Sequence, residues 1–326
     1  TRQRSLNRKS DVRFCRDVRV IAIVLRSEKV DYRCHLRCEN QLNISSGFRF
    51  IHHDHFGFPY GAAHIMCPVP PSCESPAHII LPANSHCNIQ QLFDDLIIII
   101  ILSCYSNQFP SGINKLVQSL EMFKILGVNR VVVYKTNCSM ETQRALNYYA
   151  QTGFVEEVPW SLSEFLSVSD YWSPEHNPGV LHYFGQIPAL NDCLYRHMYQ
   201  AKYVAMHDID ELILPQSVDR YHLLTFLQKV TRARTHTQLQ QLINIHFNSS
   251  VTGVNILEHL YQEPVNLRNV GKSFKIIVNP QAVFTTSVHG VLKSTNGCVW
   301  VNRTIARMYH TRFERESSLK SVKIYY

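Results

Sequence analysis

The feature that most constrains the fold is the run of seven apolar residues, LIIIIIL, at Leu96–Leu102. Successive residues of a strand point to opposite faces of a sheet, so a strand with this sequence must be buried on both faces. Such runs are typical of the centre of a parallel sheet that is covered by helices. The run is far shorter than the roughly 20 apolar residues that a membrane-spanning helix requires. We therefore expect an α/β domain with this segment at its centre.

The residues after this run alternate between helical and strand patterns. Apolar residues first recur at near-helical spacing, and Gly127 follows as an expected helix cap. The whole pattern predicts helix 113–126, strand 131–134, helix 140–151, strand 154–158, helix 186–200 and strand 203–206. Repeated strand–helix units predict a Rossmann-type mixed sheet with flanking helices.

The first 90 residues have a different character. Short apolar runs are interrupted by charges, cysteines and prolines, and six of the 14 prolines fall between Pro59 and Pro82. This composition favours short strands and irregular loops. We therefore expect a small β-rich N-terminal subdomain at 1–90, followed by the α/β domain at 91–326.

The net charge of +8 is concentrated near the N-terminus. Residues 1–40 hold 11 Lys and Arg against 5 Asp and Glu, whereas the rest of the chain holds 22 against 20. A protein that binds nucleic acid needs a basic face on its folded body. Because this body is nearly neutral, we expect no nucleic-acid partner and interpret the basic head as a solvated or juxtamembrane segment.

The cysteines and glycosylation sequons indicate the secretory lumen. The chain has ten cysteines and four N-x-S/T sequons, at Asn43, Asn137, Asn248 and Asn302. The alternative is a cytosolic protein with free thiols. Two local clusters, Cys34-His35-x-x-Cys38 and the histidines at 52–55, resemble zinc ligands, but neither supplies four ligands alone. A disulfide such as Cys67–Cys73 is the favoured interpretation.

The most informative motif is His207-Asp208-Ile209-Asp210-Glu211, directly after the expected strand at 203–206. Ligands of open α/β sheets bind at the carboxyl ends of the strands. In an extended segment, Asp208 and Asp210 point to the same face. Two carboxylates there suit Mn²⁺ or Mg²⁺ and a diphosphate, whose charge the metal neutralises. The alternative interpretation is a solvated acidic turn.

Several stretches of the chain together resemble glycosyltransferase family 92, which includes plant galactan synthases and animal galactosyltransferases. The similarity is densest in HYFGQIPALNDCLYRHMYQAKYVAMHDIDELILP at 182–215. The other matching stretches are 52–70, 120–139, 146–160, 253–264, 275–294 and 308–312. The resemblance implies a GT-A fold and an inverting transfer of a hexose from a UDP-sugar to a glycan acceptor. The expected donor is UDP-galactose and the expected metal cofactor is Mn²⁺. The same resemblance implies a type II Golgi membrane protein whose anchor lies upstream of this chain.

The resemblance also implies which residues bind the donor. The helix before the strand at 203–206 would face the nucleotide sugar, or would simply expose a polar face to solvent. Lys135 and Arg312 are further candidates for the nucleotide and its diphosphate. The predicted donor-binding residues are Lys135, Gln186, Asn191, Asp192, Arg196 and Arg312.

An inverting transfer also needs a base that takes the proton of the acceptor hydroxyl. Glu258 and Glu211 are the candidates; alternatively, Glu211 accepts a backbone hydrogen bond and Glu258 pairs with an arginine. Enzymes with a GT-A fold usually add a metal-binding histidine from the C-terminal region. We expect His310 to complete the metal site with Asp208 and Asp210, with His289 as the second choice.

Two other function classes fit the same motif. A phosphatase of the haloacid-dehalogenase type also places D-x-D after an apolar strand, but it requires Thr or Val where this chain has Leu212. A non-catalytic luminal protein that binds glycans or acts as a scaffold is the other, because the loop at 104–112 differs from the family pattern. Release of UDP, of inorganic phosphate, or of neither distinguishes the three.

Overall fold

The chain forms two compact units, Thr1–Gln90 and Gln91–Tyr326, and each contains its own sheet. The structure, a computed structural model, describes residues 17–38, 41–73, 76–80, 96–102, 112–176, 178–206, 208–216, 236–247, 261–262, 274–295, 297–302, 304–313 and 322–323. Within these ranges, no helix is both long enough and apolar enough to cross a membrane.

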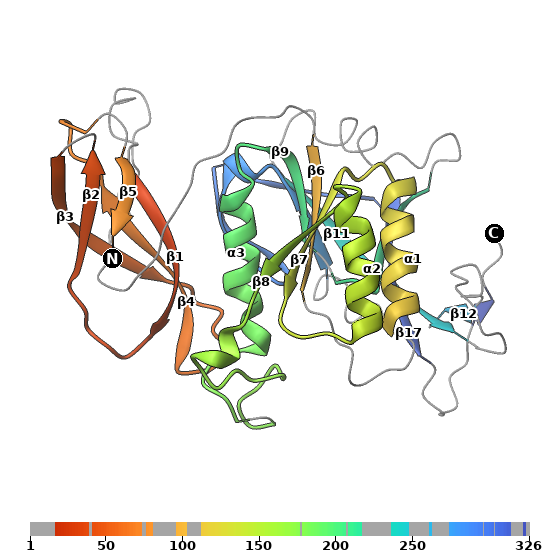
Figure 1. Ribbon diagram of the computed structural model, residues 1–326. Helices are drawn as coiled ribbons and strands as arrows, with labels where there is room; N and C mark the ends of the chain where they lie inside the picture. The colour runs from red at the N-terminus through yellow and green to blue at the C-terminus, as the bar shows by residue number, and fades with distance from the viewer. Residues whose placement is uncertain are drawn as a thin grey trace. The chain divides into compact units, whose positions relative to one another are not determined.

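The first unit is a five-stranded antiparallel sheet in the order β1-β4-β3-β2-β5 (Figure 1). Its strands are β1 (Asp17–Leu25), β2 (Tyr32–Cys38), β3 (Gln41–Ile51), β4 (Tyr60–Pro68) and β5 (Pro76–Ile80). Alternate residues of β2 and β4 face a small core that contains Cys34, Ile65 and Cys67. A core of this size gains much of its stability from covalent links.

Two disulfides supply those links, but they differ from the predicted pairing. Cys34 of β2 joins Cys67 of β4, and Cys38 joins Cys73, with Cα atoms 5.8 and 5.4 Å apart respectively. The example Cys67–Cys73 was therefore wrong, because β2 lies between β3 and β5 and presents two cysteines on its core face. The same two bonds use both thiols of the Cys34-His35-x-x-Cys38 segment, which was the alternative zinc cluster.

The second unit is built on a mixed sheet in the order β10-β17-β11-β13-β9-β6-β7-β8. Four adjacent strands, β9, β6, β7 and β8, run parallel, and the predicted run Leu96–Leu102 is β6 at their centre. The strands of this path are β6 (Leu96–Leu102), β7 (Arg130–Lys135), β8 (Val155–Pro159), β9 (Ala201–Met206), β10 (Glu211–Pro215), β11 (His236–Phe247), β13 (Phe274–Val278) and β17 (Ala306–Phe313). The sequence prediction of a mixed α/β sheet is confirmed.

The remaining strands lie off this path. A two-stranded hairpin is formed by β14 (Val283–Ser287) and β15 (Gly290–Ser294). Three short strands, β12 (Tyr261–Gln262), β16 (Cys298–Trp300) and β18 (Val322–Lys323), extend the sheet through β11.

The α-helices among the described residues also follow the predicted pattern. They are α1 (Gly112–Ile125), α2 (Met140–Gln151) and α3 (Gln186–Arg196). The Ser139 side chain accepts the Thr142 N–H at the start of α2, and Gly127 takes a left-handed φ of 78° after α1. Helix α3 ends before the predicted Gln200, because the chain turns from His197 and the Gln200 N–H bonds to the His197 carbonyl.

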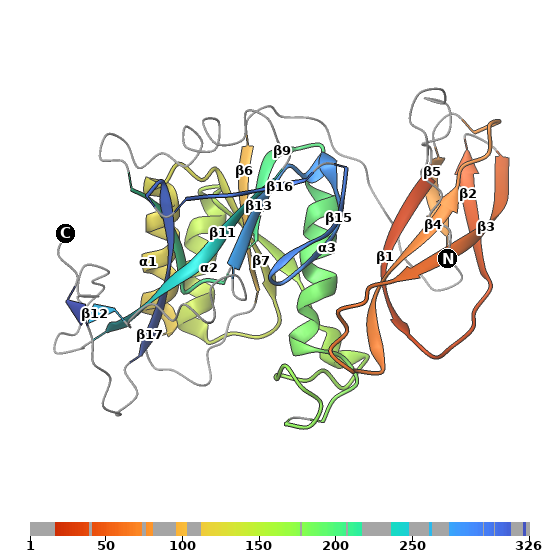
Figure 2. The same cartoon turned by 180° about the vertical axis from the view of Figure 1, so that it is seen from behind.

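The helices cover both faces of the sheet. Leu120 and Phe123 of α1 and Leu146 of α2 share one core with Val131 and Val133 of β7. Side chains at even positions of β7 point to the other face, where the Tyr134 hydroxyl reaches Asp192 of α3. Figures 1 and 2 show α1 and α2 beside one another and α3 apart from them. This arrangement leaves the carboxyl ends of the parallel strands as the edge on which ligands bind.

Candidate active site

The acidic motif forms a tight turn between β9 and β10. The Glu211 N–H donates to the Asp208 carbonyl at 3.1 Å, so residues 208–211 are not extended as the sequence analysis expected. The turn sends the two aspartates to different partners. Asp208 meets a lysine and a glutamine, whereas Asp210 meets a histidine of the C-terminal strand β17.

Asp208, whose side chain is 39% exposed, borders a cluster of opposite charges formed with the buried Lys275 and Glu211. The Lys275 ammonium lies 2.9 Å from Asp208 Oδ2 and 3.2 Å from Glu211 Oε2, and the Asp208 N–H donates to Glu211 Oε2 at 2.9 Å. Lys275 is 1% and Glu211 2% exposed. The antiparallel pairing of β13 with β9 brings Lys275 to this edge. A buried charge requires such partners, so each member fixes the others.

Burial and pairing shift the protonation of this cluster. Burial raises the pKa of the Glu211 carboxyl to about 7, against the opposing effect of Lys275. Burial alone lowers the pKa of Lys275, but Asp208 and Glu211 reverse this and raise that pKa above its ordinary value. Lys275 therefore stays protonated. Glu211 accepts a backbone hydrogen bond, which is the structural role that the sequence analysis gave as the alternative to a catalytic base. Its assignment as the base stays a prediction.

Asp210 and His310 form the second part of the site. Strands β10 and β17 pair so that Glu211 lies opposite His310, and His310 Nε2 then lies 3.2 Å from Asp210 Oδ2. Both side chains are partly exposed, at 15% and 29% for His310 and Asp210. Two atoms that bind one cation at about 2.1 Å are separated by roughly this distance. Carboxylate oxygen and imidazole nitrogen both suit Mn²⁺.

Among the residues that the structure describes, no group of three or more His, Cys, Asp or Glu side chains is arranged around one point to hold a metal. Asp208 Oδ2 is already paired with Lys275. Asp210 Oδ2 and His310 Nε2 are thus two atoms that could hold a divalent cation, and the metal role of Asp208 stays a prediction.

His289, the second choice for the metal, has different surroundings. It lies in the turn of the β14–β15 hairpin, and its Nδ1 bonds to the Phe274 carbonyl at 3.1 Å. Burial and the neighbouring Lys275 lower the pKa of His289, which keeps the imidazole neutral at pH 7. The Trp172 ring lies almost parallel to the imidazole, with ring centroids 6.3 Å apart.

Of the predicted donor-binding residues on α3, Gln186 alone contacts the acidic motif. It is the first residue of the helix, is buried, and its Nε2 lies 3.4 Å from Asp208 Oδ1. Asn191 is fully buried, and its amide bonds to the Ile187 carbonyl and to both the carbonyl and the N–H of Thr286 in β14. This side chain ties α3 to β14, and its role in donor binding stays a prediction.

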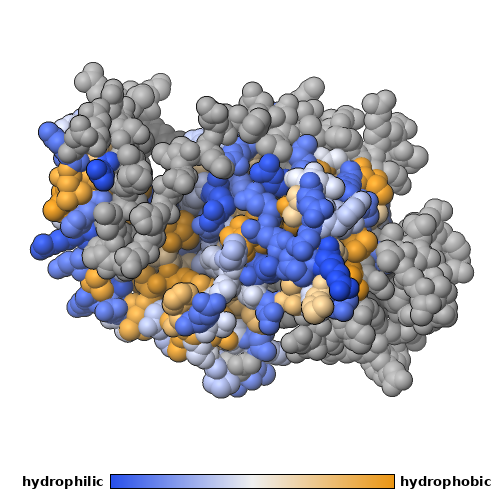
Figure 3. Space-filling view, in the orientation of Figure 1, coloured by the Kyte–Doolittle hydropathy of each residue, from blue (hydrophilic) through white to orange (hydrophobic). Residues whose placement is uncertain are grey.

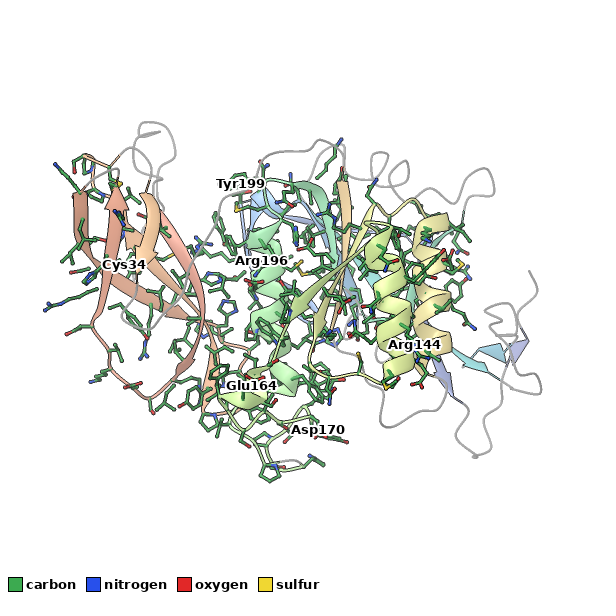
Figure 4. The ribbon with its side chains drawn as sticks, in the orientation of Figure 1. Cys34, Arg144, Glu164, Asp170, Arg196 and Tyr199 are labelled. Atoms are coloured by element: carbon green, nitrogen blue, oxygen red, sulfur yellow. A yellow bond between two sulfur atoms is a disulfide. The ribbon has the colours of Figure 1, made fainter. Side chains whose placement is uncertain are left out.

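Asp192 and Arg196 lie further along α3. Their side chains pair at 2.9 Å, and the Tyr134 hydroxyl donates to the same Asp192 oxygen. Ten residues of helix place Arg196 about 15 Å along the axis from Gln186. Figure 4 shows Arg196 towards one end of α3, with Glu164 and Asp170 beyond the other end, and Figure 3 shows a largely hydrophilic face around α3 and α2. The predicted set is thus spread along the helix rather than gathered.

The remaining candidates are only partly described. Lys135 ends β7 at the carboxyl edge, where it pairs with Glu157 at 2.9 Å and donates to Gln143 at 2.7 Å. Arg312 lies in β17, two residues after His310, and its side chain lies outside the described residues. Glu258 and residues 104–111 of the loop at 104–112 also lie outside them, and Gly112 begins α1.

Sequence reasoning missed two features of this site. Lys275 was not selected, although a lysine within the otherwise apolar strand FKIIV signals a buried partner of opposite charge. The second is the backbone before α3, where Tyr183, Phe184 and Gly185 all take positive φ values of 32°, 51° and 72°. Non-glycine residues in this region store strain, which is concentrated at functional sites.

Comparisons with known proteins place this architecture in a family. The chain is 28% identical to a Caenorhabditis elegans glycosyltransferase family 92 protein over 37% of its length, and 22% identical to the C. elegans beta-1,4-galactosyltransferase galt-1 over 67%. These alignments span 24% and 50% of the two relatives, so the chain matches half or less of each.

Solved structures with a similar arrangement are more distant. Residues 1–349 of S. aureus TarS, in complex with UDP-GlcNAc, align with a TM-score of 0.36 and 14% identity, over 68% of this chain and 60% of that one. Galactosyltransferase LgtC, in complex with donor and acceptor sugar analogues, aligns with a TM-score of 0.26 and 12% identity, over 57% and 58% respectively.

The family itself is shown by sequence. The profile of glycosyltransferase family 92 matches residues 101–323, which is more than half of the chain. The match includes the central strand β6 in part, the acidic turn and the C-terminal strand β17. The chain therefore belongs to glycosyltransferase family 92.

Proposed function

We propose that the chain is an inverting, metal-dependent glycosyltransferase with a GT-A fold that transfers galactose from UDP-galactose to a glycan acceptor. The observation that carries this proposal is the pair Asp210–His310, whose two ligand atoms lie 3.2 Å apart at the carboxyl edge of the sheet. Family membership and the relative named as a galactosyltransferase support the reaction class and the donor.

In this mechanism, Asp210 and His310 hold Mn²⁺ or Mg²⁺, which when bound neutralises the negative charge that develops on the leaving diphosphate. Lys275 and Glu211 fix Asp208 and thereby the turn that presents Asp210. Gln186 lies beside Asp208 at the start of α3, where the helix dipole favours an anionic group. These residues orient the donor, and a carboxylate takes the acceptor proton.

Glu258 is the first residue to test as that base. Glu211 is almost completely buried and is bound to Lys275 and to the Asp208 backbone, so its carboxylate is poorly placed to reach an acceptor hydroxyl. If Glu258 is the base, Glu258→Gln should lower kcat strongly while the KM of the donor changes little.

The deciding experiment measures UDP release from a panel of UDP-sugars with and without Mn²⁺. The wild-type chain should release UDP, and Asp210→Asn should reduce the rate by about 100-fold or more, because it removes an anionic ligand. Asp31→Asn, an exposed residue of the first unit, is the matched control and should leave the rate unchanged. Phosphate release instead of UDP would favour the phosphatase, and neither product would favour the non-catalytic protein.

The metal assignment has its own test. We expect His310→Ala to raise the Mn²⁺ concentration for half activity by about 10-fold or more. His289→Ala should leave this concentration unchanged, because its imidazole is held by the Phe274 carbonyl. A shift in the His289 variant alone would reverse the two roles.

We also propose that the protein works in the Golgi lumen, anchored by a segment upstream of Thr1. Two disulfides in the first unit support an oxidising compartment, and the sequon residues Asn137 and Asn302 are exposed. An N-glycosidase should increase the gel mobility of the chain when it is made in secretory cells. An unchanged mobility, together with free thiols at all ten cysteines, would contradict the luminal location.

A further inference from the structure

Three aromatic rings form a row beside the acidic turn. The rings of Tyr183 and Trp172 are stacked, with centroids 4.7 Å apart and planes inclined by 23°. The His289 imidazole continues the row at 6.3 Å from Trp172, with planes only 12° apart. We call these three residues the aromatic row. Trp172 is half-buried, with Tyr183 stacked on it and the His182 ring tilted against it at 4.9 Å, so part of its indole is reachable from solvent.

The row begins at the edge of the sheet that carries the acidic motif. His289 bonds to the carbonyl of Phe274, the first residue of β13. Because β13 pairs with β9 so that Ile276 lies opposite Met206, Phe274 lies level with the residues that follow β9, which include Asp208. The row runs from there, through Trp172, to Tyr183 in the loop before α3.

The backbone holds the row rigidly at some energetic cost. Tyr183 and Phe184 both have positive φ, and a side chain at Gly185 would collide with Leu162. The Trp160 indole donates to the Phe184 carbonyl at 3.1 Å, and the Phe184 N–H donates to the Ser169 carbonyl at 2.8 Å. A loop held in strained conformations by its own hydrogen bonds is pre-organised, which lowers the entropic cost of binding a ligand.

We propose that the aromatic row is the docking platform for a hexose ring of the acceptor glycan, with Trp172 as its main contact. The C–H face of a pyranose is apolar while its rim is polar, which is the chemistry that a partly exposed indole edged by polar groups can cover. In an inverting transfer, the acceptor attacks the sugar carbon from the face opposite the leaving diphosphate. Asp210 and His310 are the residues proposed to lie next to the diphosphate. We therefore assign the aromatic row to the acceptor rather than to the donor. This assignment of side rests on the proposed function.

The test separates glycan binding from catalysis. The 326-residue chain and its variants are applied, without any donor, to immobilised oligosaccharides that end in galactose, N-acetylglucosamine, mannose or fucose. Some of these oligosaccharides should bind the wild type. Trp172→Ala should bind the same oligosaccharides about tenfold or more weakly, because alanine cannot replace the apolar ring face. Trp172→Phe should restore most of the binding. Phe165→Ala is the matched control, since Phe165 belongs to the same loop and is 80% exposed outside the row.

A second measurement connects the platform to the reaction. For the oligosaccharide that binds, Trp172→Ala should raise the acceptor KM about tenfold, whereas the KM of UDP-galactose should not change. Equal glycan binding by the wild type and Trp172→Ala, or a raised donor KM with an unchanged acceptor KM, would overturn the inference. If the wild type releases no UDP from any donor, the proposed function fails. Glycan binding by the wild type that Trp172→Ala loses still supports the docking platform in that case. Absence of glycan binding by the wild type refutes the docking platform.

Discussion

Asn191→Ala tests whether this buried residue is structural or binds the donor. Its amide makes three hydrogen bonds, to the Ile187 carbonyl at 2.9 Å, to the Thr286 carbonyl at 2.9 Å and from the Thr286 N–H at 3.1 Å. Each bond contributes about 1 kcal/mol, and leaving the buried polar groups of Thr286 unpaired costs about 1–3 kcal/mol more. Alanine regains about 0.6 kcal/mol of helix propensity. We therefore expect the free energy of unfolding to fall by about 3–5 kcal/mol.

Urea denaturation followed by tryptophan fluorescence measures this loss, and hydrogen exchange of the Thr286 amide locates it. Asn147→Ala is the matched control, because Asn147 is an exposed helical asparagine of α2, and its effect should stay within about 0.5 kcal/mol. A loss below about 1 kcal/mol with unchanged exchange at Thr286 would refute the reasoning. Unchanged stability with a raised donor KM would instead support the predicted role of Asn191 in donor binding.

Three further changes have calculable outcomes. Lys275→Met should lower the free energy of unfolding by about 3–5 kcal/mol in a denaturant titration, because the buried Glu211 loses its counter-ion. An effect below about 1 kcal/mol would show that Lys275 and Glu211 do not form an ion pair in solution. Replacing Cys34 and Cys67 together by alanine should cost about 2–4 kcal/mol, since the bond closes a loop of 33 residues, and proteolysis should reveal the loss in the first unit alone. Burial lowers the pKa of His182 to about 4. The stability that neutral His182 contributes is therefore complete above about pH 6.5 and is lost as the pH falls towards 4. Over that range, the melting temperature of His182→Phe should fall less than that of the wild type.

The elements that could be predicted from sequence are those fixed by local patterns. The isoleucine run of β6 and the helix α2 at Met140–Gln151 were predicted with their observed bounds, because periodicity and a serine cap specify them locally. The end of α3 was missed, since the turn at His197 carries no glycine or proline signal. The extended conformation favoured for the acidic motif was wrong and the alternative of a turn was right in this respect, because the Glu211 N–H bonds to the Asp208 carbonyl.

The contacts of the site depend on pairing between distant segments. Lys275 reaches Asp208 only because β13 joins the sheet next to β9, and no local pattern specifies that register. The two disulfides follow from the strand order of the first unit in the same way. The proximity of His310 to Asp210 was expected from the family resemblance, whereas the pairing of Asp208 with Lys275 could not be predicted.

The position of β17 in the sheet has a consequence for synthesis on the ribosome. This strand lies between β10 and β11, both of which emerge earlier, so the two remain without a shared neighbour until residues 306–313 leave the exit tunnel. At about 5–20 residues per second, the roughly 90 residues between β10 and β17 take several seconds to make. Through this interval the nascent chain exposes two unpaired strand edges, which attract other chains. Closure of this part of the sheet should therefore wait until β17 has emerged and should depend on chaperones that shield these edges.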